Sequence, residues 1–219
     1  MPKKRNPEET REKILDTSLE LFRTKGYEKT TILDIVEAMD ASRGAFYHHF
    51  KAKEEVLYAI FERKEEAYTQ LCNNFLNDNN LTGIEKLRKM FTRCTELFFM
   101  GEDAKLISAL LTLMEDPKML AEQIKAIQKT QWLKPMIEQG IADGSIGQND
   151  PQVLAELIML LLDIWILPTI FPGNKDYIHA KIFMIKKILD GLGCVLLDDE
   201  FFELLTKIIE NFGKENWWK

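Results

Sequence analysis

The sequence predicts an all-helical protein, and three observations lead to this prediction. Its 219 residues include seven prolines and eleven glycines, which stand mostly between long segments whose apolar residues recur at helical spacing. No run alternates apolar and polar residues as a half-buried strand does. The apolar fraction of 46% and the charged fraction of 29% are those of an ordinary globular chain with its own core. This composition excludes a wholly disordered or fibrous protein.

The first helix is predicted over residues 7–25, because helical signals stand at both ends. Asn6 can cap its start, Pro7 suits the first helical position, and Gly26 follows its last residue. The apolar residues between these signals form one stripe, which a core-facing helix requires.

Two short helices are expected next, separated by a break at residues 40–42. Thr31 and Asp34 form a partial capping box at the start of the first. The second starts at Arg43 and runs to about Phe50. A helix, a short turn and a second helix make the layout of the helix-turn-helix motif, whose second helix reads the DNA major groove.

Longer helices fill the rest of the chain. One is predicted from residue 53 to about 72, and at 1.5 Å per residue it spans roughly 30 Å. Five or six more are expected at 83–100, 102–116, 117–144 with a candidate break near Pro135, 151–171, 176–197 and 200–212.

Several classes of protein are excluded or disfavoured. The three cysteines are far apart and form no CxxC pair, so we expect reduced thiols rather than a disulfide framework. The basic N-terminus is not followed by an apolar signal-peptide core. The most apolar stretch, 153–171, is interrupted by Glu156, Asp163 and Pro168. It therefore lacks the 18 or more consecutive apolar residues that a membrane-spanning helix needs. We therefore expect a cytoplasmic protein without a membrane partner.

Enzyme motifs are absent from the sequence. It has no serine nucleophile elbow, phosphate-binding loop, HExxH or paired metal motif. We expect no enzymatic activity, no catalytic residue, no metal site and no cofactor, although scattered catalytic groups would leave no motif.

The charge is divided unevenly along the chain. The net charge is −6, which argues against a polycation that coats nucleic acid. Residues 1–53, however, carry 11 basic and 9 acidic side chains, while residues 54–219 carry 18 and 26. From residue 41 to 53 the chain is +3 and has no acid. A local basic element can bind DNA even in an acidic protein.

The segment SRGAFYHHFKAK, at 42–53, has the composition of a DNA-reading helix. A hydroxyl cap, a first-turn arginine and a glycine allow close approach to phosphates and base edges. The alternative is a solvated basic helix end, with Phe46 and Phe50 in the core.

From Ile14 to Leu57 the sequence resembles the TetR family of transcriptional repressors. The residues that carry the resemblance are Gly26-Tyr27, Thr30-Thr31, Ile35, Ser42-Arg43-Gly44, Phe46-Tyr47, His49-Phe50 and Lys53-Glu54-Glu55. They cover about a quarter of the chain; the later helices match the family in number and order only.

The resemblance implies a role for each matching residue. The residues expected in or beside the major groove are Ser42, Arg43, Gly44, Tyr47 and His48, and those expected at phosphates are Thr31 and Lys53. For His48 and its neighbour His49 the alternative is a pair of surface and junction histidines, since a metal would need further ligands nearby.

The chain departs from the family pattern at two positions. Asp40 stands where the family commonly has glycine, and aspartate tolerates the left-handed backbone better than most residues. Ala52 stands where the family often has serine, so a side-chain cap worth on the order of 1 kcal/mol is missing. Neither change removes the expected DNA-binding role.

The resemblance also implies a function and a domain plan. A DNA-binding domain is expected at 1–52 and a larger helical ligand-binding and dimerisation domain at 53–219, connected by the helix at 53–72. The expected function is a repressor released from a pseudo-palindromic operator by a small apolar or amphipathic molecule. The alternatives are a helical ligand-binding protein that does not bind DNA, a cofactor-free enzyme that uses the C-terminal domain, and a structural scaffold.

A homodimer is expected through the helices at about 151–172 and 176–197. Both are apolar over more than one stripe, so each must bury two faces. Either both are internal, or one face forms a two-fold four-helix interface with a second copy. The dimer would present two recognition helices one DNA turn apart, about 34–36 Å.

The effector is not identified by the sequence. Aromatic, methionine and acidic side chains of the C-terminal domain are candidates to line its site: Phe98, Met114, Trp132, Met136, Met159, Asp163 and Trp165. For each apolar one the alternative is plain core packing, which is the commoner role of aromatic and methionine side chains on helices. Asp163 needs a partner if it is buried, through a cross-dimer ion pair or a ligand, unless it lies exposed at a helix edge. Trp217 and Trp218 have no assigned role.

Overall fold

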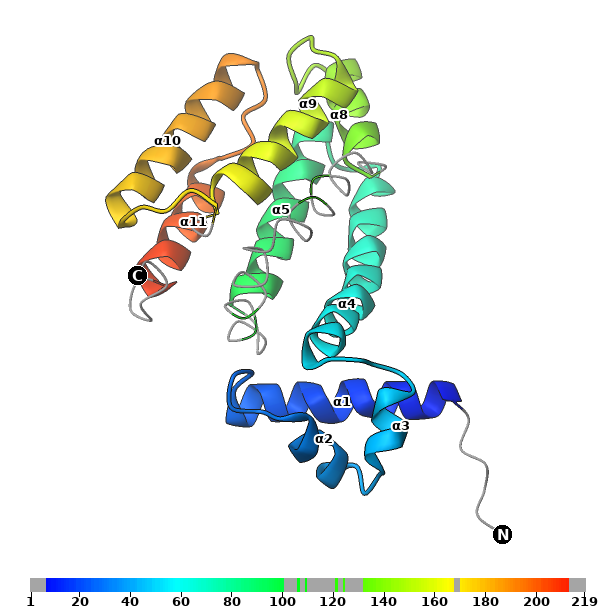
Figure 1. Cartoon of the computed structure of the whole chain (residues 1–219). Coiled ribbons are helices and arrows are strands. Elements are labelled where there is room, and N and C mark those ends of the chain that lie inside the picture. The colour runs from blue at the N-terminus through cyan, green and yellow to red at the C-terminus, as the bar shows by residue number, and fades with distance from the viewer. Residues whose placement is uncertain are drawn as a thin grey trace. The chain divides into compact units, whose positions relative to one another are not determined.

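The computed structural model describes residues 7–100, 132–167 and 170–212, together with the single residues 106, 109, 121 and 124. In this part the chain forms helices and turns and no strand, which confirms the all-helical prediction (Figure 1). The chain divides into two compact units: the first takes in residues 1–67 and 102–110, and the second takes in 68–101 and 111–219, so one division falls between Ala67 and Tyr68. We call the described residues up to Ala67 the head. The body is the chain from Tyr68 through Leu76 and all later described helices.

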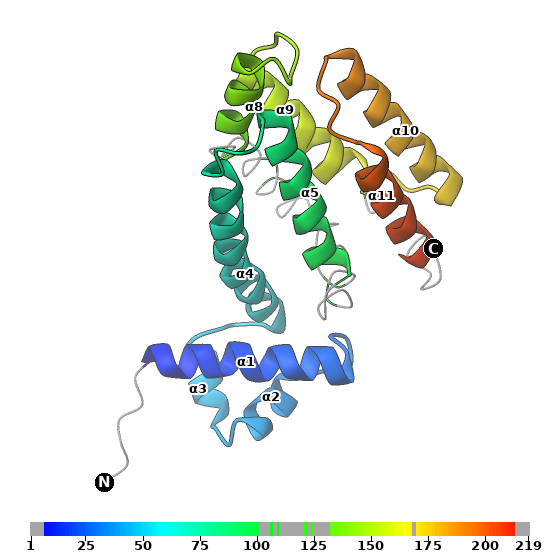
Figure 2. The same cartoon turned by 180° about the vertical axis from the view of Figure 1, so that it is seen from behind.

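The head consists of three helices and the first part of a fourth. Helix α1 is Pro7–Lys25, α2 is Ile32–Ala38 and α3 is Arg43–Tyr47, and two opposite views show α2 and α3 against the same side of α1 (Figures 1 and 2). The side chains buried between them are Ile14, Leu15, Phe22, Ile35, Met39, Phe46 and Phe50. Phe46 and Phe50 thus hold the head together, as predicted.

The turn between α2 and α3 is closed by backbone hydrogen bonds. The Ala41 amide donates to the Val36 carbonyl at 3.1 Å, and the Asp40 amide donates to the Glu37 carbonyl at 3.0 Å. This is a Schellman motif, and it requires a left-handed residue; Asp40 supplies it with φ of 49°. Helix α3 ends at Tyr47 rather than near Phe50, because the chain tightens into a turn after it.

Helix α4 is Lys53–Leu76 and contributes to both units, since their boundary lies inside it. Ala52 offers no side-chain cap, but the chain just before α4 is bonded to its first turn, because a Glu55 carboxylate oxygen accepts the Lys51 amide at 2.6 Å. The helix runs past its predicted end at 72, since Phe75 and Leu76 still pack against the core of the body. The domain boundary at 52/53 stays a prediction, because compactness does not show which part folds alone.

The body contains six described segments after α4. They are α5 (Gly83–Phe99), α8 (Leu133–Ala142), α9 (Pro151–Met159), the π-helix η1 (Leu160–Trp165), α10 (Lys175–Gly191) and α11 (Asp199–Phe212). The predicted helix at 102–116 and most of the first half of 117–144 lie outside the described residues. No helix in the described part is long and apolar enough to cross a membrane.

Two expected helices of the body differ from the prediction. The one at 151–171 is α-helical only to Met159 and then widens into η1. The one at 176–197 ends at Gly191, because Gly193 adopts φ of 71° and its carbonyl accepts the Gly147 amide at 3.0 Å. Only glycine takes such a backbone without strain.

The buried core of the body joins α5, α8, α9, α10 and α11. Between α5 and α8 the backbones meet at Gly83 and Gly140, where a Cβ on Gly83 would collide with the α8 backbone. The turn that follows α8 caps the first residues of α5. The Gly83 amide donates to the Asp143 carboxylate at 2.8 Å, and the Ile84 amide donates to the Ser145 hydroxyl at 3.2 Å.

Candidate DNA-binding interface and effector region

Helix α3 is positioned by the residue that precedes it, its N-cap Ser42. Ser42 has an extended backbone, with φ of −89° and ψ of 153°, and its hydroxyl oxygen accepts the Ala45 amide at 3.2 Å. This N-cap uses the oxygen only, so the hydroxyl proton is available to donate to an outside acceptor.

The five residues expected in or beside the major groove all lie on the solvent side of the head. Ser42, Arg43, Gly44, Tyr47 and His48 are exposed. The Tyr47 side chain is 53% exposed, although it is one of the largest apolar groups in the head. The surface therefore combines one guanidinium, two hydroxyls and an imidazole, and no carboxylate.

Gly44 is not required by the fold of the head. A Cβ added there would have only the Ser42 hydroxyl oxygen within 4 Å, at 3.8 Å. A glycine inside a helix costs roughly 0.5–1 kcal/mol relative to alanine. The position is therefore less stable than alanine would make it, and it leaves the backbone of α3 open to solvent.

Thr31 is engaged at the start of α2. Its hydroxyl donates to Asp34 at 2.8 Å and accepts the Asp34 amide at 3.2 Å. The Asp34 carboxylate also contacts the Lys25 ammonium at 2.6 Å, and this bond, with those from Thr31, lowers the pKa of Asp34 to about 2. A phosphate contact by the Thr31 hydroxyl would require this capping box to open.

Lys53, the other residue expected at a phosphate, is also engaged within the head. Its ammonium donates to the Tyr27 carbonyl at 2.8 Å and lies 4.1 Å from the centre of the Tyr27 ring. An ammonium has three donors, so two remain for an outside anion.

The adjacent histidines differ in environment. His48 is exposed and His49 is half-buried, with ring centres 5.0 Å apart. Burial, and then the positive charges of His48 and Arg11, lower the pKa of His49. His49 is thus harder to protonate than a free histidine, whereas His48 lies open to solvent. The described residues contain no group of three or more metal-ligating side chains.

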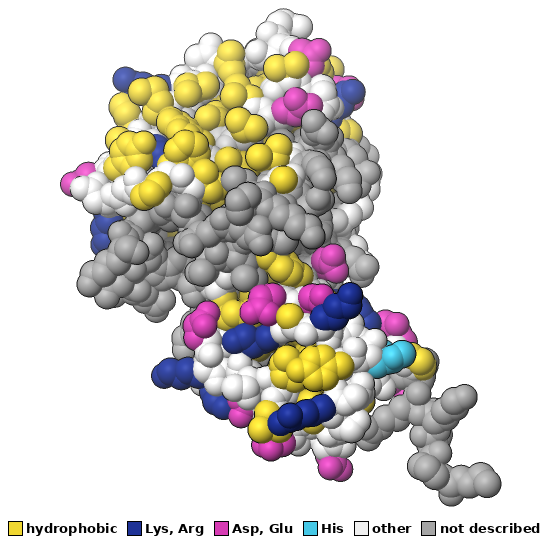
Figure 3. All heavy atoms as spheres, in the orientation of Figure 1, with side chains coloured by type: hydrophobic (Ala, Val, Ile, Leu, Met, Phe, Trp, Pro, Cys, Tyr) yellow, Lys and Arg dark blue, Asp and Glu magenta, His cyan; other side chains and the backbone are white. Residues whose placement is uncertain are grey.

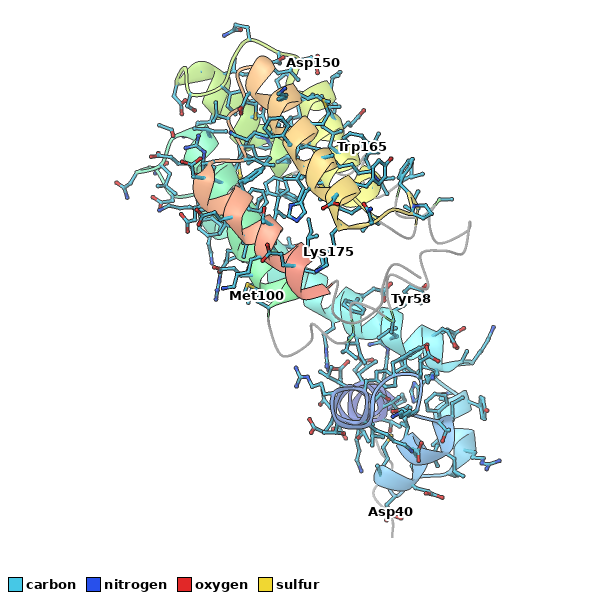
Figure 4. All side chains as sticks on the ribbon, turned by 90° about the vertical axis from the view of Figure 1, so that its left-hand side faces the viewer. Asp40, Tyr58, Met100, Asp150, Trp165 and Lys175 are labelled. Atoms are coloured by element: carbon cyan, nitrogen blue, oxygen red, sulfur yellow. The ribbon has the colours of Figure 1, made fainter. Side chains whose placement is uncertain are left out.

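The predicted effector residues fall into two groups. Met136 is fully buried in the core of the body, and Trp132, Met159 and Trp165 pack against it while keeping some exposed surface. Figure 4 shows Trp165 at the end of η1. Met114 and the side chain of Phe98 lie outside the described residues.

Asp163 lies in η1 among apolar neighbours. Burial raises the pKa of its carboxyl group from 3.8 to about 7. Asp163 also helps to raise the pKa of the Cys94 thiol on α5, after the larger effects of Cys72 and burial. The π-helix is a rare widening of a helix that is often found at functional sites.

Two buried lysines of the body were missed by the sequence analysis. Lys86 and Lys181 are each 2% exposed. The Lys181 ammonium donates to the Trp165 carbonyl at 2.8 Å and lies 4.6 Å from the centre of the Tyr177 ring and 4.7 Å from that of Phe171. Burial lowers its pKa. A lysine at a position of the apolar helical stripe was the signal in the sequence that could have indicated such burial. The carbonyl groups that accept its hydrogen bonds could not be predicted from residue spacing.

The head has the fold of a helix-turn-helix DNA-binding domain. Residues 14–60 match the family model described as bacterial regulatory proteins, tetR family. TcmR, a transcriptional regulator of Streptomyces glaucescens, is 31% identical over 119 residues, which are 53% of each chain. The chain thus spans about half the length of this relative. Residues 14–60 are thus similar to the N-terminal domain of TetR-family regulators.

Longer matches are weaker in identity. IcaR of Staphylococcus aureus, a negative regulator of a biofilm operon, is 25% identical over 164 residues, 74% of this chain and 84% of IcaR. The crystal structure of a TetR-family regulator from Pectobacterium atrosepticum has a TM-score of 0.62 at 24% identity and covers 85% of this chain and 95% of its own. SmeT, the repressor of a Stenotrophomonas maltophilia multidrug efflux pump, has a TM-score of 0.54 at 21% identity, with 92% of this chain and 89% of its own covered. These likenesses show that the body also has the TetR-family fold.

Proposed function

We propose that the protein is a ligand-responsive transcriptional regulator that represses by binding a pseudo-palindromic operator as a dimer. The observation that carries this proposal is the outward-facing surface of α3 on a head that matches the TetR family over residues 14–60. The named relatives are regulators of transcription, so an enzyme is the weaker alternative. A protein that binds operator DNA must reach it in the cytoplasm, so we propose that the protein is cytoplasmic.

The contacts with DNA are assigned by exposure and chemistry. Arg43 is the one exposed cation in α3, and arginine donates to guanine in a bidentate way. Ser42, Tyr47 and His48 add donors to phosphates or base edges, and Gly44 lets the backbone come close. Lys53 and Thr31 flank this surface as phosphate contacts, with Thr31 dependent on its capping box.

The surface proposed for dimerisation is an apolar face of α9, η1 and α10. Large apolar side chains lie exposed there: Val153 at 63%, Leu160 at 47%, Tyr177 at 45%, Phe183 at 52% and Met184 at 47%. Figure 3 shows apolar side chains gathered over α9 and α10. Exposed apolar patches of this kind mark protein interaction sites, and a two-fold pairing of the two helices would cover the patch.

Helix α4 is the proposed connection between ligand and DNA. In the head, the Arg63 guanidinium donates to Glu12 at 3.0 Å and to Asp16 at 2.7 Å, both on α1. In the body, the last α4 carbonyl, that of Leu76, accepts the Lys86 ammonium at 2.6 Å. A ligand that binds better to one arrangement of the body than to another would act on operator affinity through this helix.

The test is binding of the full-length protein to DNA from upstream of its own gene, measured by fluorescence anisotropy at fixed salt. We expect tight binding to this DNA and weak binding to a scrambled sequence. Arg43→Ala should weaken operator binding on the order of 100-fold, since two copies of a contact worth about 1–3 kcal/mol are lost.

Arg93→Ala is the matched control, because Arg93 is an exposed arginine of the body, paired only with Glu96 in the described part. It should leave operator binding unchanged. Equal affinity of the wild-type protein for the upstream and scrambled DNA would overturn the proposed function.

A further inference from the structure

Cys72 and Cys94 form a pair of thiols in the core of the body. Cys72 lies on α4 and Cys94 on α5, and their side chains are hydrogen-bonded to one another. Both cysteines are free, so the two sulfur atoms are in contact without a covalent bond. Neither the proposed DNA contacts nor the proposed dimer surface uses this pair.

The two sulfur atoms differ in their access to solvent. Cys72 is 3% exposed and belongs to the buried core, whereas Cys94 packs against that core and keeps part of its surface exposed. A small oxidant can therefore reach the Cys94 sulfur, while Cys72 holds a second thiol beside it. An accessible thiol next to a second thiol that can resolve it is typical of cysteines that oxidise reversibly.

The hydrogen bond between the thiols helps the pair to lose one proton. The bond from Cys94 stabilises a negative Cys72 sulfur and lowers the pKa of Cys72, although burial opposes this effect. The same bond, and then burial, raises the pKa of Cys94, so the second proton is retained. Because this proton lies between the two sulfur atoms, it can move along the hydrogen bond and leave the charge on the exposed Cys94 sulfur. The thiolate is the form of cysteine that reacts with oxidants.

Cys194 is an internal reference for an inert thiol. Its side chain is 0% exposed, and burial raises its pKa to about 12. The other groups that act on it are Arg88 and Asp190, and neither of the other two cysteines is among them. We therefore expect Cys194 to react with oxidants more slowly than the pair.

We propose that Cys72 and Cys94 form a reversible redox site, which closes to an intramolecular disulfide when a hydroperoxide oxidises it. The Cys94 thiolate attacks the hydroperoxide and the O–O bond breaks. The alkoxide or hydroxide that leaves takes a proton from water, and Cys94 becomes a sulfenic acid. The Cys72 sulfur then displaces the sulfenic hydroxyl group, which leaves as water with the Cys72 proton. Two electrons thus pass from the two sulfur atoms to the peroxide, and a small thiol reverses the bond by exchange.

Closure of the disulfide also changes the spacing of α4 and α5. Bonded sulfur atoms are about 2.05 Å apart, which is closer than two hydrogen-bonded thiols can lie. The bond therefore draws the two helices together at Cys72 and Cys94. That this movement alters operator affinity rests on the proposed function, in which α4 connects the body to the head; that the disulfide forms does not.

The test treats the reduced full-length protein, without DNA, with a small excess of hydrogen peroxide. The remaining thiols are counted with a chromogenic disulfide, and digested peptides are identified by mass spectrometry. We expect the loss of two thiols per chain and a peptide in which residues 72 and 94 are cross-linked, with Cys194 still reduced. The pair should be lost at least about tenfold faster than Cys194. Dithiothreitol should restore both thiols.

Two variants locate the reaction. Cys72→Ala should leave a sulfenic acid on Cys94, which dimedone traps, and no cross-link. Cys194→Ala is the matched control, because it removes a thiol outside the pair, and it should leave the cross-link unchanged. Circular dichroism establishes that the variants are folded. If one is not, the wild-type protein is compared with the same chain in concentrated urea, where the three cysteines should react at similar rates and pair without preference.

Three results would overturn the proposal. One is that the pair and Cys194 of the folded protein are lost at equal rates. Another is that Cys94 ends as a sulfinic acid or in a disulfide between two chains, in place of the cross-link to Cys72. The third is that neither thiol of the pair reacts.

Operator binding of the oxidised and the reduced protein is measured separately by fluorescence anisotropy, so that the two proposals fail independently. We expect oxidation to change operator affinity by about tenfold, a size typical of coupling between two sites, and dithiothreitol to reverse the change. If the cross-link forms but operator affinity stays the same, the redox site stands and its role in regulation fails. If the reduced protein binds no operator at all, the thiol chemistry is still decisive for the site.

Discussion

The head and the body place their charged side chains in opposite ways. In the head the charges lie at the surface, where Arg43 and His48 face solvent and pairs such as Lys25 and Asp34 are partly exposed. In the body Lys86 and Lys181 are almost completely buried, with backbone carbonyls among their partners. Arg43 and His48 of the head are thus available to a charged partner such as DNA, whereas the two buried lysines of the body maintain its structure. Asp163 of the body has no charged partner in the described chain.

The largest expected effect tests whether the charge of Asp163 destabilises the body. Asn mimics the protonated acid, so Asp163→Asn should raise the free energy of unfolding at pH 8 by about 2–4 kcal/mol. The pKa shift of about three units at 1.36 kcal/mol each sets the upper end of this range, because Asp163 keeps some exposed surface. The folded protein binds this proton more tightly than the unfolded chain does. The advantage of the variant should therefore shrink as the pH falls from 7 and vanish near pH 4.

Urea unfolding of both proteins at pH 8, 6 and 5 measures this difference. A difference that stays constant with pH, or a less stable variant at pH 8, would show that the carboxyl group is not desolvated. Asp163 would then be no different from the solvated carboxylates of the head.

The next effect concerns Lys86, whose ammonium donates to the Leu76 carbonyl at 2.6 Å and to the Gln139 side-chain oxygen at 2.7 Å. Lys86→Met keeps most of the apolar stem but leaves both oxygens without a donor. We expect a loss of about 2–3 kcal/mol in the free energy of unfolding, since a buried unsatisfied polar group costs about 1–3 kcal/mol.

Lys134→Met is the control for Lys86, because the Lys134 side chain is 44% exposed and pairs only loosely with Glu138, at 3.8 Å. It should change stability by less than about 0.5 kcal/mol. Similar losses for the two variants would contradict a structural role of the buried lysine.

In the head, Gly44→Ala should separate stability from function. The substitution should stabilise the head by roughly 0.5–1 kcal/mol, because nothing in the fold opposes a Cβ there. It should weaken operator binding by roughly tenfold, about 1.4 kcal/mol, if α3 approaches DNA at this point. Thermal unfolding and anisotropy measure the two quantities, and unchanged operator affinity would move the DNA contact away from Gly44.

The smallest effect is expected at Asp40, which lies at the tip of the head between α2 and α3 (Figure 4). Asp40→Gly should stabilise by about 0.5–1 kcal/mol, because glycine adopts φ near 49° without strain. Asp40→Ala should destabilise instead, and operator affinity should be unchanged in both. If Asp40→Gly weakens DNA binding, the turn itself takes part in recognition.

The same contrast explains how far the sequence could predict the structure. In the head the decisive contacts are local: the cap at Ser42, the capping box at Thr31 and the left-handed turn at Asp40 each involve residues within a few positions. The residue types at these positions therefore predicted both the helices and the exposed face of α3. The DNA contacts themselves stay predictions, since they depend on a partner.

In the body the decisive contacts are distant in sequence. Lys86 bonds Gln139, Lys181 bonds Trp165, and Gly147 meets Gly193, so no local pattern shows them. The widening at η1 could not be predicted either, because six residues are too few to show a periodicity of their own. Asp163 was singled out by its apolar neighbours alone, and its raised pKa follows from a burial that spacing could not establish.

The bond from Lys86 to Leu76 has a consequence for the order of folding. The first turn of helix α4 makes its contacts within the head. At the other end, the Leu76 carbonyl accepts a hydrogen bond from Lys86 of α5, whose ammonium also donates to Gln139 of α8. The Leu76 carbonyl can gain this donor only once α5 has packed against the end of α4. Until then that carbonyl is left to water, so assembly of the body should protect the last turn of α4 from fraying.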